Sequence, residues 1–411
     1  MARKMKDSGI EWIGEIPEGL EVVQLKRFAE VHNGREIDVE VDSTDSSAVG
    51  VYGSGGVFKY TNRAQYSGKA VLFGRKGTLG KPLYVEGQLW AVDTMYFLTY
   101  SNRLLEKFSY YQFLAFNWAP YITHTAIPSV VASEIVACYF PIPPLEEQAK
   151  IADYLDNGCA SLDTILDKTR SSIEEYKKLK QAVITQAVTK GVRGEREMKD
   201  SDVEWIGKIP REFNPVQLKF FCKLITDGTH FSPTTVENGW PYITAGDVHG
   251  IGLDYNSAKR ISEEDFQLLV AQGCQPLKGD VLLVKDGATT GRVGFVDSDT
   301  PCVILSSVAM LRPADNTDGH YLMYLLASDF LQKQILVSMA GSAMPRTTLT
   351  KLTKYIGLLP PLHEQKEIAN YLDAKCAEID GLIAKKEQLV KELESYKKSL
   401  IYEVVTGKRE V

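Results

Sequence analysis

The sequence has few cysteines, and none of them is spaced for a metal site. The six cysteines form no Cys-x-x-Cys pair, and none lies at zinc-finger spacing from a histidine. A disulfide framework is also not expected, because such frameworks stabilise small secreted domains and this chain has 411 residues. The cysteine usage therefore indicates a reduced, cytoplasmic protein that holds no metal ion.

Long apolar runs and a secretion signal are also missing. No run approaches the ~20 apolar residues of a membrane-spanning helix, and no apolar stretch follows the basic start MARKMKDS. We therefore expect no membrane partner. The formal net charge of −6 argues mildly against a nucleic-acid binder, because phosphate contacts need Lys and Arg. Any such contact would have to come from local basic clusters.

The familiar motifs of cofactor binding and catalysis are absent from the sequence. GATTGR at 287–292 lacks the lysine and hydroxyl of a phosphate-binding loop, and YGSGG at 52–56 is not a G-x-G-x-x-G fingerprint. The Asn/Asp-Pro-Pro-aromatic motif of amino-methyltransferases is missing, and the six histidines show no spacing of a metal cluster or triad. We therefore predict a protein that is not an enzyme and binds no cofactor.

What the sequence does contain is an internal repeat of two blocks in the same order. Residues 7–28 and 200–221 are identical at 13 of 22 positions, and residues 143–163 match 360–380 at 13 of 21 positions. The stretches between these blocks share little obvious sequence. Similar frames around dissimilar inserts favour one fold that is used for two different tasks.

A long stretch free of proline follows the start of each second block and carries apolar residues at heptad spacing. Two series offset by four residues continue over about five heptads in both copies, which is the pattern of a coiled-coil seam. A helix of ~45 residues is roughly 65 Å long. We expect the two helices to lie antiparallel. Lys180 and Lys397 in the seam would limit its register, and the alternative for each lysine is simple snorkelling at a frayed helix end. Two ordinary amphipathic helices in separate bundles are the alternative.

Eight of these apolar residues are the predicted spacer and partner contacts. They are Leu155, Leu162, Leu166, Ile173, Leu372, Ile379, Ile383 and Val390.

Both inserts have the pattern of mixed α/β domains. The predicted strands lie at 70–73, 95–100, 281–284 and 303–311, and the predicted helices at 104–118 and 321–339. The predicted fold class is therefore α/β, with two globular domains in a pseudo-two-fold repeat, separated by two long antiparallel coiled-coil helices.

Glycine turns with basic and hydroxyl side chains are the candidate DNA contacts. FGRKGTLGK at 73–81 aligns loosely with VKDGATTGR at 284–292, which pairs Gly77 with Gly287. Glycine lets a backbone approach a ligand, and Arg, Lys and Thr suit phosphates and base edges. The DGTH segment at 227–230 and the stretches just before the long helices are further candidates. The candidate residues are Lys59, Arg75, Lys76, Lys81, His124, Thr229, His230, Lys285, Asp286, Thr289, Thr290, Arg292 and Arg346. A plain hairpin with a solvated basic tip, or a capping turn, is the alternative for each segment.

Together these features resemble the specificity subunit of type I restriction–modification systems. The resemblance rests on EWIG and IP within 11–17, on their copy at 204–210, and on the helix-start motifs PIPPLEEQAKIADYLD and LLPPLHEQKEIANYLD. DGTH and GRKG also resemble motifs of target recognition domains. The resemblance covers essentially the whole chain.

The resemblance implies a division into four parts and several partners. The target recognition domains would be 1–142 and 196–359, and the conserved spacer helices 143–195 and 360–411. The chain would assemble with two modification subunits, which bind S-adenosylmethionine and methylate adenine. Two restriction subunits that translocate and cut DNA would join them.

The sequence thus predicts a DNA-binding specificity subunit. Each domain would read one half of a split double-stranded target, and the helices would fix the separation of the half-sites. A coiled-coil scaffold that binds proteins without reading DNA sequence is the alternative.

Overall fold

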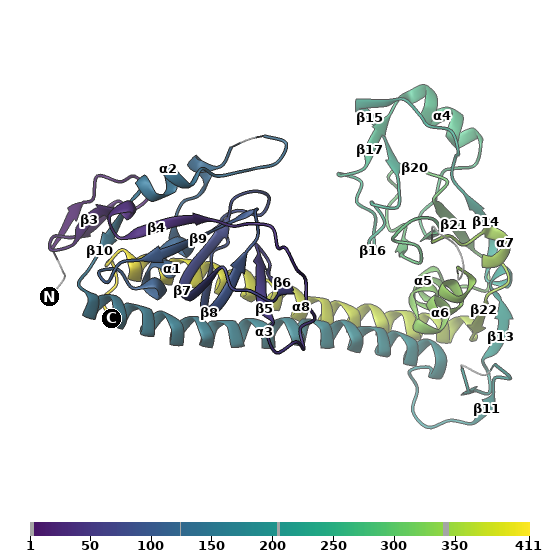
Figure 1. Ribbon diagram of the computed structural model, residues 1–411. Coiled ribbons are helices and arrows are strands. Elements are labelled where there is room, and N and C mark those ends of the chain that lie inside the picture. Colours follow the sequence, from purple (N-terminus) through teal and green to yellow (C-terminus); the bar gives the residue numbers. More distant parts are fainter. Residues whose placement is uncertain (1–3, 124, 204–205, 340–344) are drawn as a thin grey trace. The chain divides into compact units, whose positions relative to one another are not determined.

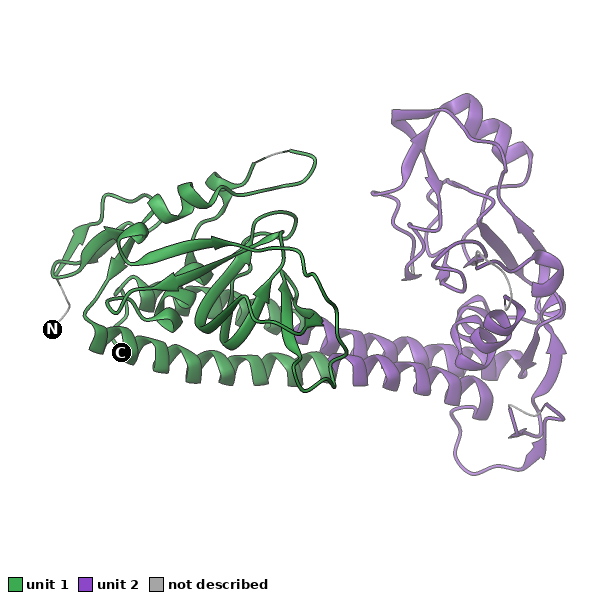
Figure 2. Cartoon of the chain, viewed as in Figure 1, with its two compact units in different colours: residues 1–171, 387–411 green, residues 172–386 purple. Residues whose placement is uncertain are grey.

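The computed structural model describes residues 4–123, 125–203, 206–339 and 345–411. The chain divides into two compact units, which we describe separately. Unit 1 contains residues 1–171 and 387–411, and unit 2 contains residues 172–386 (Figure 2). Each unit combines one globular part with segments of the two long helices, α3 (Leu145–Lys190) and α8 (Leu362–Val405) (Figure 1).

The globular part of unit 1 is built on a six-stranded sheet. The strand order is β4-β9-β7-β8-β5-β6, in which β5 and β8 are parallel and the other neighbours are antiparallel. The strands are β4 (Ala29–Asn33), β5 (Val49–Gly53), β6 (Gly56–Thr61), β7 (Tyr66–Gly74), β8 (Leu83–Ala91) and β9 (Met95–Tyr100). The helix α1 (Glu106–Ala115) contributes Phe108 and Phe113 to a core that contains Val71 and Phe73 of the sheet. β7 and β9 include the predicted strands 70–73 and 95–100.

Smaller elements of unit 1 lie before and after the sheet in the chain. The hairpin β1 (Met5–Asp7) and β2 (Glu15–Pro17) comes first, and β3 (Glu21–Gln24) pairs with β10 (Tyr139–Ile142). The short helices are η1 (Leu25–Arg27), η2 (Ala119–Tyr121) and α2 (Ala132–Ala137). The pairing of β3 with β10 brings the start of the repeat next to the segment that leads into α3.

Unit 2 has a five-stranded sheet and a three-stranded sheet. Their orders are β14-β21-β18-β19-β16 and β17-β15-β20. The strands are β14 (Cys222–Asp227), β15 (Thr235–Ile243), β16 (Gly250–Ile251), β17 (Lys259–Ile261), β18 (Val281–Val284), β19 (Val293–Phe295), β20 (Val303–Ile304) and β21 (Val308–Pro313). The remaining strands are β11 (Met198–Asp200), β12 (Lys208–Pro210), β13 (Asn214–Gln217) and β22 (Ile356–Leu359), and the short helices are η3 (Leu218–Phe220), α4 (Glu263–Ala271), α5 (Gly319–Ala327), α6 (Asp329–Ser338) and α7 (Leu349–Leu352).

Three predicted elements differ in extent from the observed ones. The run 303–311 is not one strand, because a turn in which the Val308 N–H donates to the Leu305 oxygen separates β20 from β21. The helix predicted at 321–339 is interrupted at Ser328, whose backbone is extended and whose hydroxyl donates to the Leu325 oxygen. The helix predicted at 104–118 is shorter, because only Glu106–Ala115 is helical.

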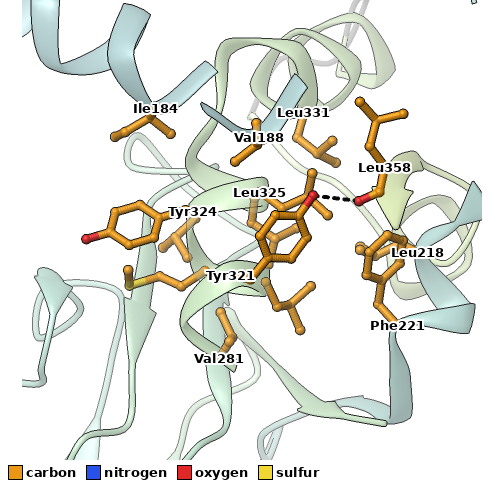
Figure 3. Close-up of a cluster of buried hydrophobic side chains, with 14 of the residues drawn as sticks. Ile184, Val188, Leu218, Phe221, Val281, Tyr321, Tyr324, Leu325, Leu331 and Leu358 are labelled. Atoms are coloured by element: carbon orange, nitrogen blue, oxygen red, sulfur yellow. Dashed lines mark hydrogen bonds between the residues drawn. The ribbon is translucent and has the colours of Figure 1, made fainter. Parts of the chain in front are cut away.

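The main core of unit 2 joins its globular part to the helix α3. Tyr321 is fully buried there and donates its hydroxyl to the Leu358 oxygen over 2.7 Å (Figure 3). Burial raises the pKa of this hydroxyl well above its ordinary value. Ile184 and Val188 of α3 lie in the same cluster. The end of α3 is thus packed against the globular part of unit 2 and forms one side of this core.

Both long helices begin with the same buried glutamine. Gln148 and Gln365 are completely buried, and they occupy corresponding positions of the repeated Pro-Pro-Leu-x-Glu-Gln motif. Gln148 accepts from the Leu105 N–H and donates to the Arg103 and Pro143 oxygens at 2.8 to 3.1 Å. Gln365 accepts from the Asp318 N–H and donates to the Asn316 and Pro360 oxygens, each at 2.9 Å. In unit 1 this side chain ties the first turn of α3 to the loop before α1, and in unit 2 it ties the first turn of α8 to the loop before α5.

A tyrosine and an aspartate repeat this attachment about two turns further along each helix. The Tyr111 hydroxyl donates to Asp156 over 2.5 Å, and the Tyr324 hydroxyl donates to Asp373 over 2.8 Å. Burial and the neighbouring carboxylate raise the pKa of both tyrosines. Each tyrosine therefore stays a neutral donor, which suits a permanent attachment between the helix and the globular part.

The helices α3 and α8 pack together along the predicted seam. In unit 1 Lys397 pairs with Asp163 at 2.6 Å, and in unit 2 Lys180 pairs with Asp380 at 2.6 Å. In each unit a later residue of one helix lies beside an earlier residue of the other, so the pairing is antiparallel. The two lysines and the two aspartates occupy corresponding positions of the repeat. The alternative of separate bundles is therefore wrong.

Two of the predicted seam residues, Leu155 and Leu162 of α3, lie in one buried cluster with Leu400 of α8. Leu155, Leu162, Leu166, Ile173, Leu372 and Ile379 are buried, and Ile383 and Val390 are half-buried.

Candidate nucleic-acid interface

In unit 1, two turns leave the sheet on either side of β9. The last residues of β4 and β7 pair with the first residues of β9, and the chain then enters the turns 34–36 and 75–77. The first N–H of turn 34–36 donates to the Met95 oxygen over 2.9 Å, and the first N–H of turn 75–77 donates to the Thr94 oxygen over 2.7 Å. Both turns therefore lie at the same end of the sheet.

Unit 2 repeats this arrangement around β21. β21 lies between β14 and β18, and the chain continues from these strands into the turns 228–230 and 285–287. The first N–H of turn 228–230 donates to the Val308 oxygen over 3.3 Å, and that of turn 285–287 donates to the Ser307 oxygen over 2.8 Å. The DGTH segment and the glycine turn, which are far apart in the sequence, are thus neighbours.

In both units a third segment pairs with the second turn. It comprises residues 128–130 in unit 1 and residues 345–347 in unit 2. In unit 1 the Gly77 N–H donates to the Pro128 oxygen (2.9 Å), and the Val130 N–H donates to the Arg75 oxygen (3.1 Å). In unit 2 the Gly287 N–H donates to the Pro345 oxygen (3.0 Å), and the Thr347 N–H donates to the Lys285 oxygen (2.9 Å). Gly77 and Gly287, which the sequence alignment pairs, therefore occupy the same place. We call the three segments together the loop edge of the unit. The loop edge of unit 1 comprises residues 34–36, 75–77 and 128–130, and that of unit 2 comprises residues 228–230, 285–287 and 345–347.

Basic side chains dominate the loop edge of unit 1. Lys76 is exposed, and the Arg75 guanidinium lies 5.7 Å from the centre of the Tyr96 ring. Lys81 is exposed four residues beyond the loop edge. Within the part of the chain that the structure describes, none of these three has a carboxylate partner. The candidate His124 lies outside the described residues.

Lys59 has a different environment from the other candidates of unit 1. It lies on β6, and its ammonium is 2.7 Å from Glu40, with both side chains about half exposed. The ion pair already compensates its charge, so Lys59 is less suited to a phosphate than the basic residues of the loop edge.

In unit 2, Lys285 is at the centre of a charged cluster. It is 2% exposed, and its ammonium lies 2.9 Å from Asp286 and 3.2 Å from Asp227. Asp286 also lies 2.9 Å from the guanidinium of Arg346, which is exposed. In this arrangement Lys285 is not available to a phosphate. The cluster instead joins all three segments of the loop edge, since Asp227 immediately precedes turn 228–230.

The remaining candidates of unit 2 divide into exposed and structural side chains. His230 is exposed, whereas Thr229 is buried and its hydroxyl accepts from the Phe231 N–H over 2.9 Å. The Thr290 hydroxyl hydrogen bonds to the Gly287 oxygen at 2.7 Å and lies 3.1 Å from the Pro345 oxygen, so it supports the turn. Thr289 and Arg292 are half-buried, and the Arg292 guanidinium donates to the Val248 oxygen over 3.5 Å.

The sequence interpretation missed the first turn of unit 1. Asn33-Gly34-Arg35 takes the place that DGTH has in unit 2, but only the glycine is shared. An Asn-Gly dipeptide is a turn signal, so the turn itself was detectable. Its equivalence to DGTH was not, because it depends on hydrogen bonds to residues 91–95.

Across the described residues, no three or more His, Cys, Asp and Glu side chains are grouped so that they could hold a metal ion. In the same part of the chain, none of the helices combines the length and apolar character needed to cross a membrane.

Comparison with known proteins gives the same family for both halves of the chain. The family model described as type I restriction modification DNA specificity domain matches residues 17–175 and 210–392. The type I restriction enzyme MjaVIII specificity subunit of Methanocaldococcus jannaschii is 28% identical over 350 residues, which cover 82% of this chain and 76% of that protein. The EcoBI specificity subunit of Escherichia coli is 26% identical over 257 residues, covering 59% of this chain and 52% of that protein.

The fold is also found in a solved structure. A chain from a study of complex assembly and conformational transition of the type I R-M system superposes with a TM-score of 0.71 at 18% identity, over 96% of this chain and 99% of that chain. The repeated fold, the paired helices and the two family matches lead to one conclusion. This chain belongs to the type I restriction–modification DNA specificity family, and it is a specificity subunit with two target recognition domains.

Proposed function

We propose that each unit reads one half of a split double-stranded DNA target through its loop edge. The observation that carries this proposal is the hydrogen-bonded frame that both loop edges share, together with the different side chains that they present. The position of Lys76 in unit 1 is occupied by Asp286 in unit 2, and that of Ser129 by Arg346. The two loop edges share one backbone arrangement but carry side chains of different charge. This suits two domains that both read bases but recognise different DNA sequences.

The candidate residues take different roles in this proposal. Arg75, Lys76, Lys81, His230 and Arg346 are DNA contacts, with Lys76 and Arg346 near base edges and the others near phosphates. Thr289 and Arg292 stand beside the second turn and are minor contacts. Lys285, Asp286, Thr229 and Thr290 position the turns.

The chain assembles into a type I restriction–modification complex with DNA, and we propose two modification subunits and two restriction subunits as its partners. The support is the duplication of exposed apolar residues on the long helices. Leu145 and Tyr154 on α3 correspond to Leu362 and Tyr371 on α8, and all four are exposed. Two equivalent surfaces suit two copies of one partner. The net charge of −6 also favours partners that contribute positive surface around the DNA.

The paired helices act as a spacer in this proposal. The target recognition domains are 1–142 and 196–359, and the spacer segments 143–195 and 360–411 fix the separation of the half-sites. Methylation of adenine and cleavage of DNA occur in the partner subunits.

The test is methylome sequencing of cells that carry this chain with its modification subunit, compared with cells that lack the chain. We expect a split adenine-methylated motif that disappears on deletion. The variant Arg75→Ala/Lys76→Ala should weaken or alter one half-site, and His230→Ala/Arg346→Ala the other. Arg63→Ala and Arg211→Ala are matched controls, because both residues are exposed and ion-paired outside the loop edges. If the assembled complex retains the same motif and the same DNA affinity in all variants, the alternative of a protein-binding scaffold gains support.

A further inference from the structure

The turn 34–36 of unit 1 is the structural counterpart of the DGTH segment in unit 2. The Arg35 N–H donates to the Ala91 oxygen over 2.9 Å, and the Thr229 N–H donates to the Ile304 oxygen over 3.2 Å. Gly34 and Gly228 precede them, and a Cβ atom would lie 1.8 Å from the Val92 oxygen in one turn and 1.9 Å from the Ile304 oxygen in the other. Both turns thus need glycine for the same reason, which is a close backbone approach.

The turn that carries Arg35 is held rigidly by side chains of neighbouring strands. The Gln65 amide donates to the Asn33 oxygen over 2.9 Å, and the Trp90 indole N–H donates to the Arg35 oxygen over 2.8 Å. Gln65 also accepts from the Ala91 N–H over 2.9 Å. The backbone on both sides of the turn is therefore fixed before any ligand binds, which reduces the entropy lost on binding.

The Arg35 side chain itself is exposed and unpaired. Among the residues that the structure describes, no carboxylate or other hydrogen-bond acceptor contacts its guanidinium. Basic residues of unit 1 outside the loop edge include compensated ones, such as Arg63, which pairs with Asp38 at 3.2 Å, and Lys69, which pairs with Glu86 at 3.6 Å. An arginine on a rigid turn, without an internal partner among the described residues and on the same loop edge as Lys76, is well placed for an external acceptor.

We propose that Arg35 reads a guanine in the half-site bound by unit 1. This inference rests on the proposed function, because it assigns a base contact within the same loop edge. The planar guanidinium donates two parallel hydrogen bonds to O6 and N7 of guanine in the major groove, which no other base accepts in that pattern. A lysine keeps the charge but not this geometry.

The test is selection of DNA sequences from a random pool by the purified complex of this chain with its modification subunits. The wild-type complex should select a split motif with a guanine in one half-site. Arg35→Ala should relax that single position, with a loss of discrimination of roughly 5- to 150-fold, and the other half-site should stay unchanged. Arg35→Lys should keep binding yet relax the same position. Arg63→Ala, in the same unit, should select the wild-type motif.

Each other outcome overturns the inference. An unchanged motif in Arg35→Ala, a uniform loss at all positions, or a full rescue by lysine would each mean that Arg35 reads no base. Loss of all binding in both Arg35 variants, with an unchanged melting temperature, would assign Arg35 to affinity alone. A wild-type complex that selects no split motif would overturn the proposed function as well, so the two failures are distinguishable.

Discussion

Lengthening both long helices by one heptad tests whether they set the separation of the half-sites. In α3, residues 166–172 would be duplicated directly after Ser172, and in α8, residues 383–389 directly after Leu389. Both insertions lie between the contacts Arg170–Glu394 and Tyr176–Lys386. Each duplicated block continues the seam, because a heptad insertion preserves the repeat of apolar residues.

The expected change follows from the geometry of the two polymers. Seven residues lengthen a helix by about 10.5 Å, and a base pair of B-DNA occupies about 3.4 Å along the axis. The preferred spacer should therefore become longer by about three base pairs. An insertion of about one turn in both helices should lengthen it by one or two base pairs.

The assay is methylome sequencing of cells that express the variant with the modification subunit. Both half-sites should stay the same and only the spacer should change. Insertion into α3 alone is the control, because Arg170–Glu394 and Tyr176–Lys386 could not then form together, and methylation should be lost. If the double insertion methylates the original spacer as efficiently as the wild type, the reasoning is refuted.

Three further predictions concern stability. Gln148→Ala and Gln365→Ala should each lower the free energy of unfolding by about 1–3 kcal/mol, because buried backbone groups lose their hydrogen-bond partners. Urea denaturation measures this change, and a change below the experimental error would contradict the proposed anchoring. Lys397→Asp should destabilise the chain by about 0.2–1 kcal/mol, because the ion pair of Lys397 with Asp163 is partly exposed. Adding Asp163→Lys should restore the lost stability. Two independent, additive effects in a double-mutant cycle would argue against the ion pair. Gly228→Ala should cost more than about 1 kcal/mol, since the new methyl group collides with the Ile304 oxygen; a melting temperature equal to that of the wild type would exclude this close approach.

The sequence by itself determined the repeat, the long helices and the apolar faces that run along them. These features depend on local periodicity, because an apolar residue every three to four positions marks one face of a helix whatever the helix packs against. The duplicated blocks also predicted that the two helices pair antiparallel. The ion pairs Lys397–Asp163 in unit 1 and Lys180–Asp380 in unit 2 agree with this prediction.

Element boundaries were less predictable where a tertiary contact decides them. The apolar run 303–311 has uniform β propensity, yet its two ends belong to different sheets, because β20 pairs with β15 and β21 pairs with β14 and β18. Propensity contains no information on such a distant partner.

The tertiary structure alone decided the surroundings of the candidate side chains. Lys285 and Lys76 are both lysines of glycine turns, but one is buried between two aspartates and the other is exposed. Arg35 was overlooked because the place of its turn in the loop edge depends on the strands β8 and β9, which begin about 50 to 60 residues later. Helical periodicity is encoded by neighbours in sequence, whereas the loop edge is assembled by strand ends that only the folded sheet brings together.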